Sequence, residues 1–231
     1  FSATMPDKIQ TLARNILYKP VEVKIAVSKP AEKIKQSAYV CYDTQKLPIL
    51  RHIFATEEQK RIIIFSGKKE RVKEINRELQ KIKVNCCSMH SDLTQQERDE
   101  VMYLFKSGQK DVLVATDIVA RGIDIDDIRM VRNYDVPHDA EDYVHRIGRT
   151  ARADRDGVAI TLVNPDDIRS FQQIEHFLEK EVIKTPLPDG LGDAPEYKSP
   201  ERRKGPRGGG KRRGNRGVKK NGKNKQEKKK I

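Results

Sequence analysis

Short apolar runs alternate along most of this chain with longer segments in which apolar residues recur every three or four positions. Continuous short runs such as RIIIF and GVAITLV are typical of strands buried on both faces, and the longer spacing is typical of helices that cover them. Strands are predicted at residues 34–42, 61–65, 84–89, 111–116, 128–133 and 157–163. Helices are predicted at residues 44–55, 69–82, 94–106, 139–149 and 165–180. The pattern therefore predicts an α/β fold, with a mostly parallel sheet and helices on both faces, over residues 34–184.

The two ends of the chain differ from this middle. Residues 6–17 have the spacing of an amphipathic helix and residues 21–25 alternate like a strand, followed by a predicted linker at 26–33. A lone helix and strand cannot bury their apolar faces, so we expect this first segment to be loosely docked or disordered. Residues 185–231 are rich in Pro and Gly and then in Lys, Arg and Gly, and we expect them to be disordered.

The charge of the protein is concentrated in this last segment. Residues 196–231 carry 16 Lys and Arg against 3 Asp and Glu, which is the whole of the net charge of +13. The preceding part of the chain is neutral. A neutral body with a strongly basic tail predicts an anionic partner for the tail.

The cysteines and the hydropathy pattern predict the compartment in which the protein is found. Cys41, Cys86 and Cys87 lack the spacing of metal ligands, so we expect small buried residues in a reducing compartment and no metal site. No apolar run approaches the length of a membrane span. The expected localisation is cytoplasmic, with no membrane partner.

Polar residues follow several of the predicted strands. Ser66, the run from His90 to Asp92, and the pair Thr116 and Asp117 each come directly after an apolar run. The carboxyl ends of parallel strands lie at one edge of a sheet, where ligands of such sheets bind. The sequence therefore predicts one binding site that these residues share.

A second candidate site is the cation-rich stretch HRIGRTARAD. It contains His145, Arg146, Arg149 and Arg152. On a helical turn the three arginines would lie along one face, which suits a polyanion better than a core. The alternative is a solvated, charged helix with scattered surface ion pairs.

Taken together, several stretches resemble motifs of the DEAD-box RNA helicases. VATDIVARGIDI followed by HRIGRTAR resembles motifs V and VI, and three further stretches resemble motifs III, IV and IVa: FSAT at 1–4, IIIFSGKK at 62–69 and QQER at 95–98. The resemblance covers residues 1–178 and implies the second, C-terminal RecA-like domain, with residues 1–25 as a remnant of the first. Within the family, HRIGRTARA with a basic tail is most similar to bacterial RhlE-type proteins.

The resemblance implies a nucleotide site. At these motif positions the family uses Arg149 and Arg152 to contact the γ-phosphate of ATP, while His145 and Arg146 are expected to couple the site to its surroundings. Asp124 resembles the carboxylate that accepts a ribose hydroxyl, beside Gly122, which allows close approach of the backbone. A local turn in which Arg121 pairs within its own segment is the competing interpretation.

The resemblance also implies an RNA site. Gln95, Arg98, Thr116 and Asp117 match RNA-contacting positions of the family, and Ser66 lies at the same predicted sheet edge. Contacts with phosphates and riboses predict little sequence preference. A capping box formed by Thr94 and Glu97 would also explain the start of the helix at 94–106, and both interpretations can hold together.

Two motifs that an ATPase needs do not occur in this sequence. No strand leads into GxxxxGK[ST], because the match at 205–211 is followed by Arg212 and lies in the tail, and no DEAD sequence is present. ATP and Mg²⁺ are therefore expected to bind mainly to a missing N-terminal RecA-like domain, and this chain alone is expected not to hydrolyse ATP. The start at Phe1, without Met, also suggests a fragment.

The predicted function is the C-terminal half of an ATP-dependent RNA helicase that opens short duplexes locally. One alternative is a non-enzymatic RNA-binding or annealing module that acts through its basic tail. Another is a DNA helicase of the same superfamily.

Overall fold

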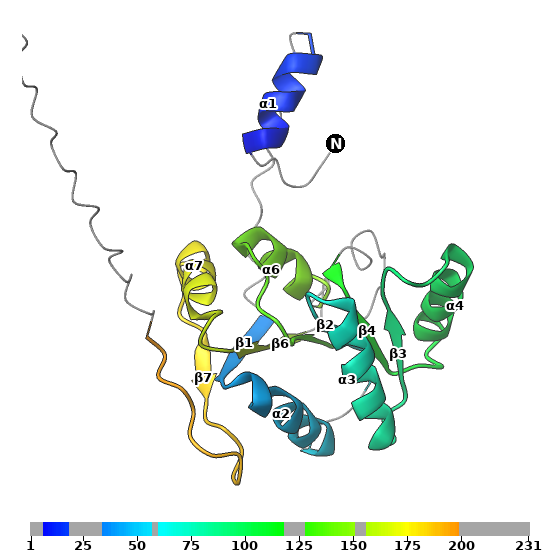
Figure 1. Ribbon diagram of the computed structural model, residues 1–231, viewed down its shortest axis with the longest axis vertical. Helices are drawn as coiled ribbons and strands as arrows, with labels where there is room; N and C mark the ends of the chain where they lie inside the picture. Colours follow the sequence, from blue (N-terminus) through cyan, green and yellow to red (C-terminus); the bar gives the residue numbers. More distant parts are fainter. Residues whose placement is uncertain (1–6, 19–33, 57–59, 118–127, 151–155, 199–231) are drawn as a thin grey trace, which may run out of the picture. The chain divides into compact units, whose positions relative to one another are not determined.

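The computed structural model describes residues 7–18, 34–56, 60–117, 128–150 and 156–198. Within these ranges, seven strands form one sheet in the order β3-β4-β2-β5-β6-β1-β7, and every neighbouring pair is parallel (Figure 1). The strands are β1 (Ile34–Val40), β2 (Ile62–Phe65), β3 (Cys86–Met89), β4 (Val112–Ala115), β5 (Met130–Asn133), β6 (Gly157–Val163) and β7 (Ile183–Thr185). The predicted fold class is confirmed.

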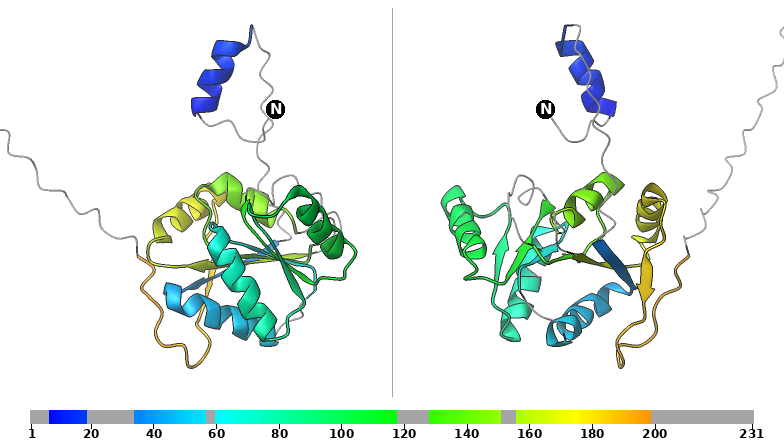
Figure 2. Two further views of the ribbon diagram at one scale, coloured as in Figure 1. Left: turned by 45° about the vertical axis from the view of Figure 1, so that its right-hand side comes forward. Right: turned by 180° about the vertical axis from the view of Figure 1, so that it is seen from behind.

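Helices cover both faces of the sheet (Figures 1 and 2). They are α2 (Asp43–Thr56), α3 (Lys69–Lys81), α4 (Gln95–Lys106), α6 (Ala140–Ile147) and α7 (Ile168–Leu178). Apolar residues of α2 and α3 join one buried cluster, and those of α4, α6 and α7 join another on the opposite face. Every residue of β2 and β4 is buried, because these strands are covered on both sides.

The predicted strands and helices of the sheet region lie within three residues of their observed bounds. Two helix ends and one further strand differ from the prediction. The last helix was predicted from Pro165, but residues 165–167 form a turn and α7 starts at Ile168. The helix predicted to end at Arg149 ends at Ile147. Strand β7 was not predicted, because its short sequence IKT has no apolar run and leaves Ile183 exposed at the edge of the sheet.

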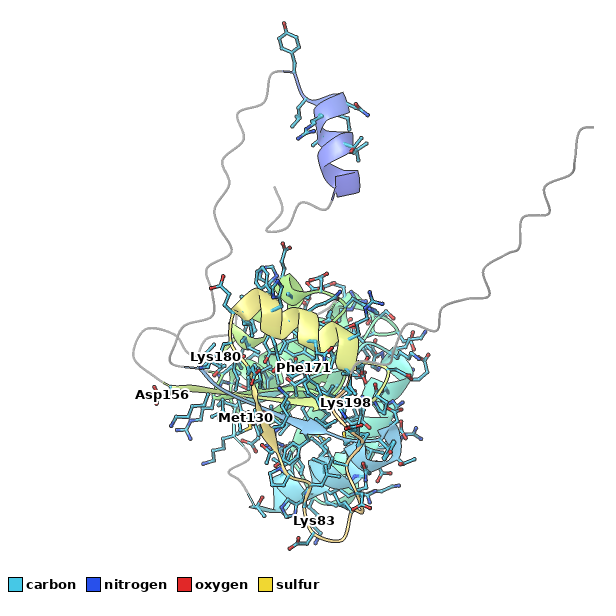
Figure 3. The ribbon with its side chains drawn as sticks, turned by 90° about the vertical axis from the view of Figure 1, so that its left-hand side faces the viewer. Lys83, Met130, Asp156, Phe171, Lys180 and Lys198 are labelled. Carbon is cyan, nitrogen blue, oxygen red and sulfur yellow. The ribbon has the colours of Figure 1, made fainter. Side chains whose placement is uncertain are left out.

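Residues 186–198, here called the closing segment, contradict the predicted disorder from residue 185 onward. Gln45 donates hydrogen bonds to the carbonyl oxygens of Leu191, at 2.7 Å, and Asp193, at 3.1 Å. Tyr197 packs edge-on against Phe171 of α7, which is labelled in Figure 3, and the ring centroids lie 6.4 Å apart. The Tyr197 hydroxyl donates a hydrogen bond to Glu175 at 2.5 Å. These contacts tie a stretch without periodicity to the body, which a hydrophobic pattern cannot reveal.

Helix α1 (Asp7–Ile16) forms near the predicted position. Leu12, Ile16 and Leu17 are all more than half exposed. The predicted strand at 21–25 and the linker at 26–33 lie outside the described residues, as does the basic segment from residue 199. Their assignments remain predictions.

The three cysteines are buried and free, as predicted. Burial raises the pKa of the Cys41 and Cys86 thiols to about 11 and that of Cys87 to about 12, so all three are unreactive thiols at neutral pH. No helix in the described ranges is long and apolar enough to cross a membrane.

Candidate functional site

The residues that follow the carboxyl ends of β2, β3, β4 and β5 lie along one edge of the sheet, here called the carboxyl-end rim. Ser66 follows β2, and its backbone amide donates to the carbonyl oxygen of Ala115 at the end of β4, at 3.0 Å. Thr116, the next residue, donates its amide to Met89 at the end of β3, at 3.3 Å. The structure thus brings the residues predicted after separate strands into one neighbourhood.

Asp135, which follows β5, connects residues of this rim through hydrogen bonds. The sequence did not predict Asp135 as a site residue. One of its carboxylate oxygens accepts hydrogen bonds from the Ser66 hydroxyl, at 2.6 Å, and from the Gly67 amide, at 3.0 Å. Ser66 is fully buried, so its hydroxyl is committed to Asp135 and holds the rim together from inside. Asp135 could have been found by the same strand-end rule that selected Asp117.

Lys46, near the start of α2, lies completely buried beside the rim. Its ammonium nitrogen lies 3.2 Å from Asp135, 3.3 Å from Asp43 and 3.8 Å from Asp167. These carboxylates come from α2, from the segment after β5 and from the turn before α7. Nothing local in the sequence distinguishes Lys46 from a surface lysine, so only the packing reveals it.

Arg146 overturns the prediction that the arginines of HRIGRTAR share an exposed face. It is 4% exposed, and its Nε and Nη2 each lie 2.6 Å from a different oxygen of Asp117. Its Nη1 donates to the side chain of Asn133, at 3.2 Å, and to the Asp135 carbonyl, at 2.7 Å. Burial of this cation is possible because an anion and two neutral acceptors surround it.

Arg149 lies beyond the helix, in the turn that follows it. Gly148 ends α6, and a Cβ on it would meet the Val144 carbonyl oxygen at 2.9 Å. Thr150 then forms a parallel bridge with Ile128, so the chain turns back to the sheet. Arg149 and His145 are both half-buried, whereas Arg146 points into the body. Arg152, Gly122 and Asp124 lie outside the described residues.

The start of α4 confirms the capping box, and the assignment of Gln95 and Arg98 to RNA stays a prediction. Thr94 and Glu97 form the predicted capping box, in which the amide of each residue donates to the side chain of the other. Arg98 donates to the Ser91 carbonyl oxygen at 3.2 Å, and Gln95 donates to Asp99 at 2.9 Å. The cap uses the residues that were not assigned to RNA, so it leaves Gln95 and Arg98 with exposed surface.

A group of charges that the sequence indicated only in part lies beside Arg98. Lys69 and Lys73 of α3 each lie 2.6 Å from Asp92, in the loop between β3 and α4. Hydrogen bonds from both lysines lower the pKa of Asp92 to about 2. Burial, and then the nearby charge of Lys73, lower the pKa of His90, which is therefore neutral at pH 7. The sequence had indicated this group through the run from His90 to Asp92 and through Lys69 within IIIFSGKK, whereas Lys73 was not predicted.

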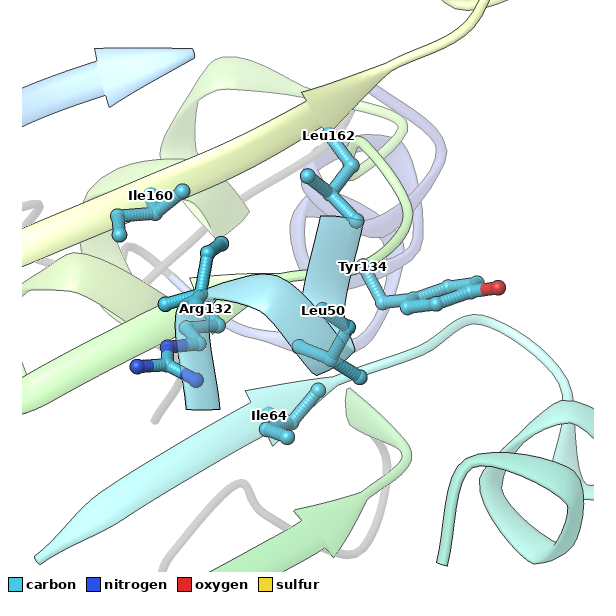
Figure 4. A pocket seen from close by; sticks show the side chains of 7 residues that line it. Leu50, Ile64, Arg132, Tyr134, Ile160 and Leu162 are labelled. Carbon is cyan, nitrogen blue, oxygen red and sulfur yellow. The ribbon is translucent and has the colours of Figure 1, made fainter. Parts of the chain in front are cut away.

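A small cavity lies elsewhere in the body. Seven residues, including Leu50, Ile64 and Leu162, line a small space between α2 and the sheet (Figure 4). Arg132 also lines this space, and its guanidinium carbon lies 4.2 Å from the centroid of the Phe54 ring. No group of three His, Cys, Asp or Glu side chains in the described ranges could hold a metal ion.

Comparisons with known proteins agree with this geometry. The model of the helicase conserved C-terminal domain matches residues 45–154. The probable ATP-dependent RNA helicase DDX23 of Homo sapiens is 39% identical over 188 residues, which make up 80% of this chain and 23% of that protein. For eight similar curated proteins, the matched stretch of this chain spans 23% to 40% of their length.

Solved structures extend the comparison. The match to Dbp5 of S. cerevisiae, solved bound to RNA and ADP BeF3, covers 80% of this chain and 50% of the Dbp5 chain, with 31% identity and a TM-score of 0.72. The E. coli DEAD-box protein SrmB, bound to regulator of ribonuclease activity A, matches 71% of this chain and 99% of its own, with 38% identity and a TM-score of 0.65. The chain therefore belongs to the DEAD-box RNA helicases, of which it contains the C-terminal, RecA-like helicase domain.

Proposed function

We propose that this domain supplies arginine fingers to an ATPase site shared with an N-terminal RecA-like domain, and that it grips RNA for local unwinding. The observation that carries this proposal is the position of Arg146. Its side chain holds Asp117 at the end of β4, and its carbonyl oxygen accepts a hydrogen bond from the Arg149 amide at 3.1 Å. Arg146 therefore links the end of β4 to the turn that contains Arg149, so a movement of one of these segments displaces the other.

The nucleotide half of the proposal rests on Arg149 and Arg152. Arg149 is half-buried in the turn that follows α6, so part of the residue is exposed at the domain surface. Charge spreads over the transferred phosphoryl oxygens in the transition state, and a guanidinium from a second domain stabilises it. Asp124, beside Gly122, would accept the ribose hydroxyl. Mg²⁺ and most of the phosphate contacts would belong to the N-terminal domain.

The RNA half of the proposal rests on the carboxyl-end rim. Gln95, Arg98 and Thr116 would contact the sugar-phosphate backbone, and Ser66 would support them from inside through Asp135. The Asp117 carboxylate is neutralised by Arg146, so its charge need not repel a phosphate. Closure on the N-terminal domain would bend one RNA strand and open a short duplex, and hydrolysis would release it. Dbp5, solved with RNA and ADP BeF3, is a relative in which both ligands occur together.

The experiment is ATP hydrolysis by this chain joined to a DEAD-box N-terminal domain, with and without RNA. We expect Arg149→Ala to lower RNA-stimulated turnover by about a thousandfold, in line with related arginine fingers. Arg51→Ala, on the exposed side of α2, is the matched control and should leave turnover unchanged. Turnover that is indifferent to Arg149 would favour an annealing module that acts through the tail.

A further inference from the structure

The two lysines on the first turns of α3 share one carboxylate. Lys69 and Lys73 are four residues apart, so their ammonium groups lie on the same side of the helix and repel each other. Asp92 offers one oxygen to each, at 2.6 Å in both cases. The carboxylate therefore bridges two cations that belong to a different element of the fold.

The surroundings of this bridge carry excess positive charge and an unused polar atom. Arg98 lies close enough to His90 to lower the pKa of that imidazole, as do Lys69 and Lys73. His90 is 6% exposed, and its Nδ1 has no hydrogen-bond partner among the described residues. Asp92 is the one carboxylate that both lysines contact in these ranges. This geometry is that of an anion site already filled by the protein itself.

We propose that Asp92 stands in for an RNA phosphate and thereby restrains the RNA affinity of this domain. In the bound state, the two anionic oxygens of a phosphodiester in single-stranded RNA take the place of the carboxylate between Lys69 and Lys73. The inference rests on the proposed function, because it concerns the same carboxyl-end rim beside Arg98. It adds two contact residues and an internal competitor to that site.

The exposure of the three side chains makes this exchange feasible. Lys69, Lys73 and Asp92 are 41%, 45% and 37% exposed, so RNA can reach the bridge without unfolding either element. Ion pairs at such exposure are weakly held and are easily exchanged. A flexible lysine stem can follow a phosphate over a short distance. Asp92 then lowers affinity by competition and leaves the fold unchanged.

The test is RNA binding by the full chain, measured as fluorescence anisotropy of a short labelled oligouridylate over a range of salt concentrations. We expect Asp92→Asn to tighten binding roughly threefold or more at low salt. The slope of log Kd against log salt should steepen by about 0.7, which corresponds to one further phosphate contact on a single strand.

The matched control is Asp156→Asn, which removes the same negative charge at the amino end of β6, away from the carboxyl-end rim. Asp156, labelled in Figure 3, lies 3.9 Å from Lys35. This variant should change affinity far less. The double variant Lys69→Gln/Lys73→Gln should bind more weakly, and Asp92→Asn should bring no gain in that background. Acetylation of lysines read by mass spectrometry should show RNA protecting Lys69 and Lys73, more strongly in Asp92→Asn.

The outcomes separate the two proposals. If the parent chain binds RNA but Asp92→Asn matches Asp156→Asn or binds more weakly, the stand-in role of Asp92 is wrong and the proposed function stands. Unprotected Lys69 and Lys73 in RNA-saturated protein would have the same meaning. Failure of the parent chain to bind any RNA would overturn both.

Discussion

At the scale of single residues, Lys46 shows how a buried charge is stabilised beside the rim. Removal of an ammonium from water is costly unless anions surround it. Three carboxylates do so here, yet they respond differently. Burial opposes the charge on Asp135, but Lys46 and hydrogen bonds from Ser66 and Gly67 outweigh it and lower its pKa. Burial dominates at Asp167 and raises its pKa.

These opposite pKa shifts predict opposite effects of charge removal on the free energy of unfolding. Asp135→Asn should destabilise the protein at pH 7 by roughly 1–3 kcal/mol, because hydrogen bonds to a charged group are lost. Since its folded-state pKa is lowered, the stability that Asp135 contributes is present above about pH 4 and is lost as pH falls further. The difference between parent and Asp135→Asn should therefore shrink in acid.

Asp167→Asn is the internal comparison for that variant. The folded-state pKa of Asp167 is raised, so its ionised form is disfavoured in the folded state, and the cost appears as pH rises through that pKa. We expect Asp167→Asn to be at least as stable as the parent at pH 7. Urea unfolding of both variants at neutral and acid pH checks this pair, and equal losses for the two at pH 7 would contradict it.

At the scale of elements, the ends of helices decide where the candidate residues lie. The capping box starts α4 at Gln95 and directs Arg98 back toward the loop at Ser91. Gly148 ends α6 one residue before Arg149, so Arg149 lies in a turn and not on a helical face. The pattern predicted a helix that reaches Arg149, because spacing alone carries no information about where the chain turns back to the sheet.

The capping box yields a prediction at this scale. Thr94→Ala removes the acceptor of the Glu97 amide and should cost about 1 kcal/mol of folding free energy, whereas Thr94→Ser keeps the hydroxyl and should cost much less. Hydrogen bonds from the Thr94 backbone and side chain lower the pKa of Glu97, so the contribution of Glu97 fades as pH falls below about 4. Denaturant unfolding measures both effects, and equal losses for Ala and Ser would show that the cap does not matter.

At the scale of the whole molecule, the boundary of the folded body lies later than the composition suggests. The closing segment adds Leu187 and Leu191 to one buried cluster and Tyr197 to the other. Lys184 of β7 lies 4.4 Å from the Tyr197 ring centroid and pairs with Glu175, so the sheet edge, α7 and the closing segment share one group of contacts.

Truncation tests this boundary. A chain that ends at Thr185 should melt roughly 5 °C or more below the full chain, because it loses the apolar burial and hydrogen bonds of the closing segment. A chain that ends at Pro200 should keep the full melting temperature, because it retains the whole closing segment. Equal melting of the two truncated chains would show that the closing segment does not stabilise the body.

The basic tail makes a separate prediction for the whole molecule. Its cations should displace counterions from RNA, so deletion of residues 200–231 should flatten the salt dependence of RNA binding. The measurement is the slope of log Kd against log salt for the full and shortened chains. An unchanged slope would mean that the tail has no part in RNA binding.

The sequence by itself determined the layered α/β fold, the capping box, the burial of the cysteines and the edge at which the polar residues gather. These features follow from hydrophobic periodicity and turn chemistry, which are local along the chain. The motifs also indicated the family and the candidate residues of both ligand sites.

Only the tertiary structure decided which charged residues are buried and which segments are ordered. Arg146 is buried because Asp117, which lies 29 residues earlier in the chain, meets it bidentately. Lys46 is buried because Asp135 and Asp167 reach it from distant turns. The closing segment is ordered because Gln45, almost 150 residues away, binds its carbonyl oxygens. Such contacts join residues far apart in sequence, and no local pattern encodes whether a charge finds its partner.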